Sequence, residues 1–151
     1  LHVALTNFPM QDVIEARVML ERYSARLAAR GRTSADLQRL RSLSAAMHTP
    51  DISPDDFNEL DTAFHVAVAD ASGNRLVADM TTAIRESMRL PILASFRSLE
   101  DWSSHADRLC TEHVAVLTAI EAGDEHEAAT SVEEHIRFNY TTMKWDRPSR
   151  D

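Results

Sequence analysis

The chain has 151 residues, a length that fits one domain with a single hydrophobic core. Its net charge of −8 lacks the basic footprint of a nucleic-acid binder, and its one cysteine, Cys110, excludes an intrachain disulfide. Only three glycines and five prolines are present, which favours helices over sheet. There is no visible signal peptide and no apolar run of roughly 18 residues, so we expect a cytoplasmic protein that does not span a membrane.

The first half of the chain predicts three helices, because apolar residues recur there every three or four positions. These helices cover residues 10–30, 35–47 and 57–71. Gly31 is a natural stop for the first helix, and Ser53 followed by Pro54 and two acids is a strong start for the third. Residues 1–9 have no clear period and are interpreted as a lead-in or linker from a missing N-terminal module, since the chain starts at Leu1 rather than Met.

The second half predicts three more helices. The fourth runs from an Asn74 cap to about Leu90, where Pro91 kinks or ends it. Residues 95–103 are the least periodic stretch, and a fifth helix follows from about 104 to 122. Gly123 ends it and a sixth helix begins at once, so these two helices should be antiparallel neighbours. The prediction is an all-α, antiparallel bundle of six or seven helices, with residues 146–151 as a frayed polar tail.

Four polar side chains interrupt the apolar stripes of this predicted bundle. Asp61 and His65 are one turn apart on the third helix, and His113 and His135 lie on the stripes of the last two helices. A carboxylate and three imidazoles inside a core are costly unless something satisfies them. Together they are the ligand set of a divalent metal, with Zn as the first choice and Ni, Co, Fe or Mn as alternatives.

Convergence of these side chains is compatible with their spacing. His113 lies ten residues before Gly123, and His135 lies eleven residues after Asp124. Two such positions are nearly level across an antiparallel pair of helices. For any single histidine, a structural role with one hydrogen-bond partner is the simpler interpretation, and only the combination indicates a metal site.

Further polar residues have two interpretations each. Arg17 lies on the apolar stripe of the first helix, where it either pairs with a neighbouring acid such as Glu21 or holds a carboxylate or phosphate. The first helix alone favours pairing. Arg85 and Arg89, one turn apart, are interpreted as solvated, with a pocket-lining role as the alternative, and Asn139 lies on or beside the last apolar stripe.

Three functions remain open from the residues alone. They are a metal-dependent sensor of small molecules, a metalloenzyme that uses the same four residues, and a structural bundle without ligand. Hydrolysis by metal-activated water is conceivable, but no acid is clearly placed as a general base. No HExxH, Walker, GxGxxG or GxSxG motif is present.

The order of several short motifs resembles one known family over about residues 10–143. These motifs are Glu15-Ala16-Arg17 with Leu20-Glu21, Asp61-x-x-Phe64-His65, Ala71-Ser72-Gly73-Asn74, Glu112-His113 with Ala119-Ile120 and Gly123-Asp124, and Ala128 with Glu134-His135-Ile136. The chain resembles the C-terminal effector-binding domain, called FCD, of the FadR subfamily of GntR transcription regulators. The resemblance implies a bacterial, non-enzymatic, helical domain in residues 10–145 that binds a small organic acid and forms a homodimer.

The resemblance also assigns roles to residues. It implies that Asp61, His65, His113 and His135 hold a divalent metal, zinc first, and that the metal and Arg17 together bind an effector carboxylate. Arg85, Arg89 and Asn139 are further candidates for the effector site, and a second arginine anchor would suit a dicarboxylate or hydroxy acid. The winged helix-turn-helix of the family has no counterpart in this chain, so DNA binding is expected only through a separate N-terminal domain.

Overall fold

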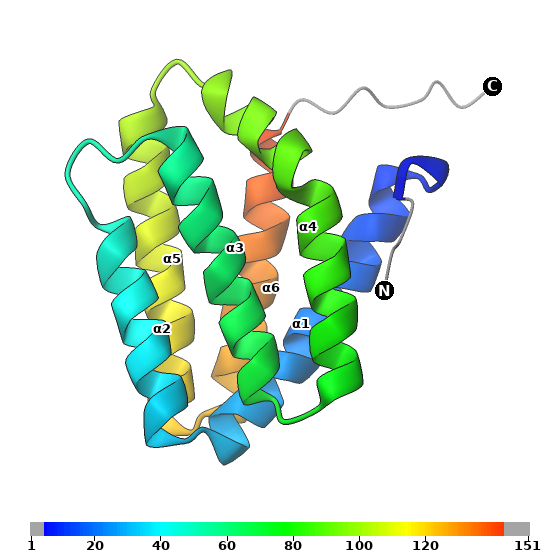
Figure 1. The fold of residues 1–151 in the computed structure, drawn as a ribbon, viewed down its shortest axis with the longest axis vertical. Coiled ribbons are helices and arrows are strands. Elements are labelled where there is room, and N and C mark those ends of the chain that lie inside the picture. The colour runs from blue at the N-terminus through cyan, green and yellow to red at the C-terminus, as the bar shows by residue number, and fades with distance from the viewer. Residues whose placement is uncertain (1–4, 144–151) are drawn as a thin grey trace.

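The computed structural model describes residues 5–143, which contain six α-helices and one short 3-10 helix, with consecutive α-helices antiparallel (Figure 1). The elements are η1 Leu5–Asn7, α1 Met10–Gly31, α2 Ser34–Met47, α3 Pro54–Ala71, α4 Arg75–Arg97, α5 Trp102–Ala122 and α6 Glu125–Thr142. This confirms the prediction of an all-α antiparallel bundle. Residues 1–4 of the predicted lead-in and the predicted tail, 146–151, lie outside the described residues.

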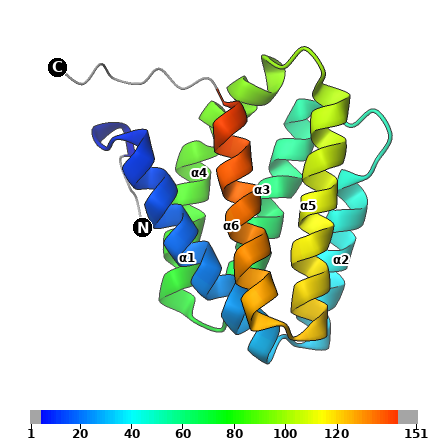
Figure 2. The same cartoon turned by 180° about the vertical axis from the view of Figure 1, so that it is seen from behind.

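The helices form two layers. Figure 1 shows α4, α3 and α2 side by side, and Figure 2 shows α1, α6 and α5 side by side on the opposite face. The closest neighbours are α1 with α6, α3 with α4, and α5 with α6, and α1 also packs on α3 across the layers. Within residues 5–143, no helix combines the length and apolar character needed to cross a bilayer.

Local sequence signals set most helix starts. One residue before each of five helices, a side-chain oxygen accepts a hydrogen bond from the backbone N–H three residues later, and these residues are Thr33, Ser53, Asn74, Asp101 and Asp124. Gly123 ends α5 with a φ of 72°, and a Cβ there would lie 3.1 Å from the Arg32 guanidinium. A residue without a side chain therefore fits this turn best.

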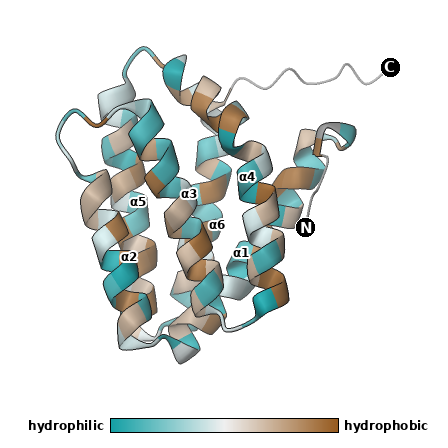
Figure 3. Cartoon of the chain, viewed as in Figure 1, coloured by the Kyte–Doolittle hydropathy of each residue, from teal (hydrophilic) through white to brown (hydrophobic). Residues whose placement is uncertain are grey.

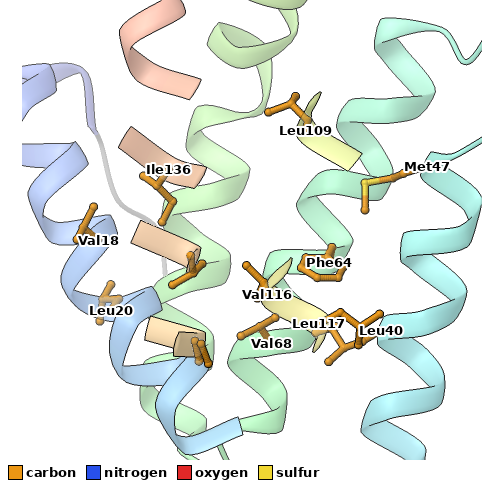
Figure 4. Packing of buried hydrophobic residues seen from close by; sticks show 14 of the residues in the cluster. Val18, Leu20, Leu40, Met47, Phe64, Val68, Leu109, Val116, Leu117 and Ile136 are labelled. Carbon is orange, nitrogen blue, oxygen red and sulfur yellow. The ribbon is translucent and has the colours of Figure 1, made fainter. Parts of the chain in front are cut away.

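Apolar side chains from all six helices form one buried core. Figure 4 shows part of it, with labelled residues from α1, α2, α3, α5 and α6. Leu40, Phe64, Leu109 and Ile136 come from four different helices, and each is completely buried. Figure 3 shows hydrophobic and hydrophilic residues interspersed along each helix, as expected for helices with one buried face. The polar cluster described below lies within this core.

Two predicted boundaries were wrong. Helix α4 continues through Pro91 to Arg97 rather than ending near Leu90, because Ile92 and Phe96 beyond the proline are buried and hold the last turns in the core. Helix α5 begins at Trp102, two residues earlier than expected, and the irregular connection shrinks to residues 98–101.

Candidate metal centre

Four buried side chains converge at the centre of the bundle. Asp61 and His65 come from α3, His113 from α5 and His135 from α6, and none is more than 2% exposed. One ligand atom from each lies within 4.8 Å of the other three. The imidazoles of His113 and His135 have ring centroids 4.4 Å apart, so the two positions are level across the hairpin, as their spacing predicted.

The inward-facing atoms of the cluster are the three imidazole Nε2 atoms and Oδ1 of Asp61. Asp61 Oδ1 lies 2.8 Å from His113 Nε2, 3.3 Å from His65 Nε2 and 3.9 Å from His135 Nε2. Ligand atoms bound to one ion at about 2.1 Å can be at most about 4.2 Å apart. The three distances from Asp61 Oδ1 lie below this limit, whereas the 4.8 Å span of all four atoms lies somewhat above it, so the side chains would move slightly inward to bind one cation.

Carboxylates fix the outer nitrogens of two imidazoles. His65 Nδ1 contacts Oε1 of the buried Glu21, and His135 Nδ1 lies 2.9 Å from Glu112 Oε2. Burial alone would raise the pKa of Glu21, but Arg17 and His65 lower it well below its usual range. Burial also opposes ionisation of Glu112, but the hydrogen bonds and charges of His135 and Arg108 together outweigh burial and lower the pKa of Glu112. Since an ionised carboxylate only accepts, each of these Nδ1 atoms must donate a proton.

Nε2 of His65 and Nε2 of His135 face each other 3.1 Å apart. Burial lowers the pKa of His135 to about 3, so with its Nδ1 donating to Glu112 its Nε2 carries a lone pair near neutral pH. The two imidazole nitrogens and Oδ1 of Asp61 converge on one small buried volume, and a divalent cation there would take them as ligands. The residues present therefore fit a metal ion.

His113 differs from the other two imidazoles. Its Nδ1 is buried and has no hydrogen-bond partner within residues 5–143, while its Nε2 faces Asp61. The ring of Phe64 packs against it with centroids 4.8 Å apart, and burial lowers the pKa of His113. Asp61 Oδ1 accepts a hydrogen bond from Nε2 of His113 at 2.8 Å, and packing rather than a carboxylate holds the outer side of this ring.

Arg17 is fully buried and lies beside the cluster. Its Nε donates to Glu21 Oε2 at 2.5 Å and its Nη1 to the Tyr140 hydroxyl at 3.3 Å. The predicted pairing with Glu21 is thus present, but inside the core rather than at the surface. Because Glu21 also binds His65, one carboxylate connects this arginine to the cluster.

Arg85 is also fully buried, so its interpretation as a solvated residue was wrong. Its Nη2 donates to Asp61 Oδ2 at 2.6 Å and to the Thr62 hydroxyl at 3.1 Å. Its Nε and Nη1 have no partner among the described residues, although a buried guanidinium normally satisfies its donors. The two free donors mark a place for a hydrogen-bond acceptor.

Of the remaining candidates for the effector site, Asn139 is buried and Arg89 is exposed. Oδ1 of Asn139 has no hydrogen-bond partner in the described part of the chain. Arg89 is 44% exposed, lies 3.6 Å from Glu59, and is not brought into the cluster. A cavity of about 420 Å³ opens between α1 and α4, but none of the four clustered ligands lines it. Its lining residues are Leu5, Phe8, Asp12, Val13, Ala16, Met80 and Ile84.

The roles of Glu21 and Glu112 were not anticipated from the sequence. A usable signal was present, since Glu21 follows Arg17 by four residues and both lie on the buried side of α1. Glu112 directly precedes His113, and at that position it faces the neighbouring α6 and reaches His135.

The chain is thus an all-α bundle with one Asp and three His at its centre, and these four side chains could hold a metal ion. The chain matches the FCD domain model over residues 12–138 and belongs to that family. The family membership predicted from the sequence is confirmed.

Curated relatives are bacterial transcription regulators. The chain is 29% identical over 133 residues to the putative L-lactate dehydrogenase operon regulatory protein of Escherichia coli K12, covering 88% of this chain and 51% of that protein. It is 30% identical over 129 residues to the transcriptional regulator LutR of Bacillus subtilis, covering 84% and 58% respectively. The Glc operon transcriptional activator of E. coli K12 is 27% identical over 133 residues, with 85% and 52% covered. The chain thus spans about half the length of these relatives.

Solved structures agree on the fold. Streptococcus agalactiae GntR superposes with a TM-score of 0.67 at 26% identity, over 84% of this chain and 55% of that one. E. coli McbR/YncC gives a TM-score of 0.77 at 16% identity, over 87% of this chain and 66% of that one, which supports the fold alone.

Proposed function

We propose that this domain binds a divalent metal ion, zinc first, and senses a small organic acid next to that ion. The observation that carries the metal is the convergence of Asp61, His65, His113 and His135 in one buried volume, with carboxylates holding the outer nitrogens of His65 and His135. Zn, Ni, Co, Fe and Mn all accept imidazole and carboxylate ligands.

The charge balance supports an anionic ligand. Arg17 is paired with Glu21, Arg85 with Asp61 and Arg108 with Glu112, so three guanidinium groups balance three carboxylates around the site. A divalent ion adds two positive charges to a buried, otherwise neutral group of residues. The positive excess therefore comes from the ion, and a carboxylate bound to the ion would offset it.

The unpartnered atoms support a hydroxy acid. Nε and Nη1 of Arg85 are free donors suited to a carboxylate, and the buried Oδ1 of Asn139, which interacts with His105 without a full hydrogen bond, is an acceptor that a hydroxyl group could use. The name of one relative links it to an L-lactate dehydrogenase operon, and lactate is itself a 2-hydroxy acid. In this proposal Arg17 borders the site, while Arg89 lies outside it.

Regulation would require more than this chain. The relatives are about twice as long, and we propose that a separate N-terminal winged helix-turn-helix supplies DNA binding in the bacterial cytoplasm. A homodimer through α1 and α4 is part of the same proposal, because Met19, Leu76 and Leu90 are exposed apolar residues on these helices. Catalysis is disfavoured, since the relatives are regulators and both nearby glutamates are engaged in hydrogen bonds.

Calorimetry on the zinc-loaded protein tests the acid site. Two matched pairs, propionate with L-lactate and succinate with L-malate, differ by one hydroxyl group. The hydroxy acid of each pair should bind about tenfold more tightly, the worth of one well-placed hydrogen bond. Arg85→Met should abolish the binding, Arg17→Ala should weaken it, and the exposed Arg89→Ala is the matched control. No binding of any acid to metal-loaded wild type would overturn the sensor function.

A further inference from the structure

Glu21 has two buried partners of different kinds. Its Oε1 accepts from Nδ1 of His65, and its Oε2 accepts from Nε of Arg17 at 2.5 Å. The carboxylate is 2% exposed, comes from α1, and joins a candidate metal ligand on α3 to a buried arginine. Both partners are donors and each contacts a different oxygen, so a carboxylate, with an acceptor at each position, satisfies them together.

Glu112 makes a natural comparison within the same cluster. Its Oε2 accepts from Nδ1 of His135 at 2.9 Å, and its Oε1 accepts from Nε of Arg108 at 3.1 Å. Arg108 is 58% exposed and lies at the surface. Each carboxylate therefore orients one imidazole, but only Glu21 also holds an arginine inside the core.

We infer that Glu21 is the positioning residue that joins the two halves of the site, holding His65 with its Nε2 ready for the metal and Arg17 in place for the acid. This inference rests on the proposed function. A hydrogen bond from the outer imidazole nitrogen fixes both the tautomer and the orientation of the ring. The second oxygen restrains the guanidinium, whose fork must be oriented to receive a carboxylate.

The variant Glu21→Gln tests the metal half. A glutamine amide can accept from one donor with its oxygen, but its NH₂ group then faces the other donor. Zinc affinity, measured by competition with a chromophoric chelator, should fall by about 10–100-fold. Glu112→Gln should cause a fall of similar size, whereas Glu133→Gln, which removes a carboxylate bridging Arg22 and Arg137 away from the cluster, should not.

A spectroscopic readout separates positioning from a general loss of packing. In metal-free protein, long-range ¹H–¹⁵N correlations of the imidazoles report which nitrogen carries the proton. His65 and His135 should both be protonated on Nδ1 in wild type. Glu21→Gln should change the pattern of His65 alone, and Glu112→Gln that of His135 alone. An unchanged His65 pattern together with unchanged zinc affinity would overturn the role of Glu21.

The acid half is tested at saturating zinc, with the acid that wild type binds most tightly among the four tested above. Removal of a negative charge would by itself strengthen anion binding, so the sign of the change is informative. We expect Glu21→Gln to bind this acid about tenfold more weakly, because Arg17 loses its restraint. Glu112→Gln, which also removes a negative charge but releases no buried arginine, should bind the acid no more weakly than wild type, and the control Glu133→Gln should match wild type. Equal or tighter acid binding by Glu21→Gln would refute the link to Arg17.

These outcomes remain distinct from failure of the proposed function. If wild type binds neither zinc nor an acid, the sensor proposal fails whatever Glu21 does. If wild type binds both and Glu21→Gln does so equally well, only the inference about Glu21 fails. Should Glu21→Gln not fold by circular dichroism, Glu21→Asp keeps the charge on a shorter arm that cannot reach both partners, and zinc or acid affinity should then fall.

Discussion

Replacement of Asp61 by Asn should strongly destabilise the metal-free protein. Within residues 5–143, Asp61 is the only carboxylate in an ion pair with Arg85, through Oδ2 at 2.6 Å, while Glu21 adds a longer-range attraction, and both Asp61 and Arg85 are at most 2% exposed. Arg85 already has two donors without partners in the described chain. Breaking a buried pair so that one charge remains uncompensated costs about 3–5 kcal/mol. The free energy of unfolding should fall by about that amount.

The double variant Asp61→Asn/Arg85→Met tests whether the uncompensated charge of Arg85 causes the loss of stability. It removes both charges, and replacement of a whole buried pair is often close to neutral. We expect it to be more stable than Asp61→Asn alone. The exposed pair of Arg39 and Asp70, about half accessible, provides the control, and Asp70→Asn should cost below about 1 kcal/mol.

Urea denaturation followed by circular dichroism, in the presence of a chelator, measures all of these free energies. A cost for Asp61→Asn no larger than that of Asp70→Asn would refute the buried pair. A double variant as unstable as Asp61→Asn would show that the uncompensated Arg85 is not the cause.

Three further predictions concern the metal, pH and assembly. His113→Ala should lower zinc content, measured by mass spectrometry, and thermal stability, measured by melting, because an ion bound only by the folded state stabilises that state. The control His126→Ala, at an exposed position, should change neither quantity. Metal-free protein should lose stability as pH falls from 7 to 5. His135 takes up a proton near pH 6.5 in the unfolded chain, whereas burial lowers its pKa to about 3 in the folded protein. This one group should lower the free energy of unfolding by about 2 kcal/mol between pH 7 and pH 5, as measured by chemical unfolding at both pH values. A flat profile would contradict a buried neutral His135. Sedimentation at micromolar concentration should show a dimer that Met19→Asp, at a position 65% exposed, dissociates; a wild-type monomer would count against assembly through this domain.

Helix positions could be predicted from the sequence because their signals are local. The caps at Ser53 and Asn74 and the stop at Gly123 act through backbone groups within a few residues, and the structure has helix ends at each. The fourth helix was predicted too short because Pro91 is a local signal for ending a helix. Burial of Phe96 beyond it is a tertiary effect, and it outweighed the local preference.

The candidate site was found where a polar residue broke an apolar stripe, as with His113 and His135. Arg85 occupies the same kind of position, since Thr81, Met88 and the following apolar residues of α4 are buried on its side of the helix. It was interpreted as solvated because a lone arginine usually reaches water. Its carboxylate partner lies 24 residues away on another helix, and no spacing rule within one helix reveals such a pair.

The position of the cluster has an energetic consequence for sensing. The four clustered residues come from α3, α5 and α6, and the buried arginines beside them come from α1 and α4, so both layers of the bundle contribute. The two donors of Arg85 that have no partner within residues 5–143 are costly in a buried position. An ion and an acid that satisfied them would remove that cost and connect helices of both layers at once. Binding would therefore stabilise the whole domain rather than one surface loop. In the proposed function, binding at this depth would make the bundle more rigid, and that change in rigidity would carry the signal.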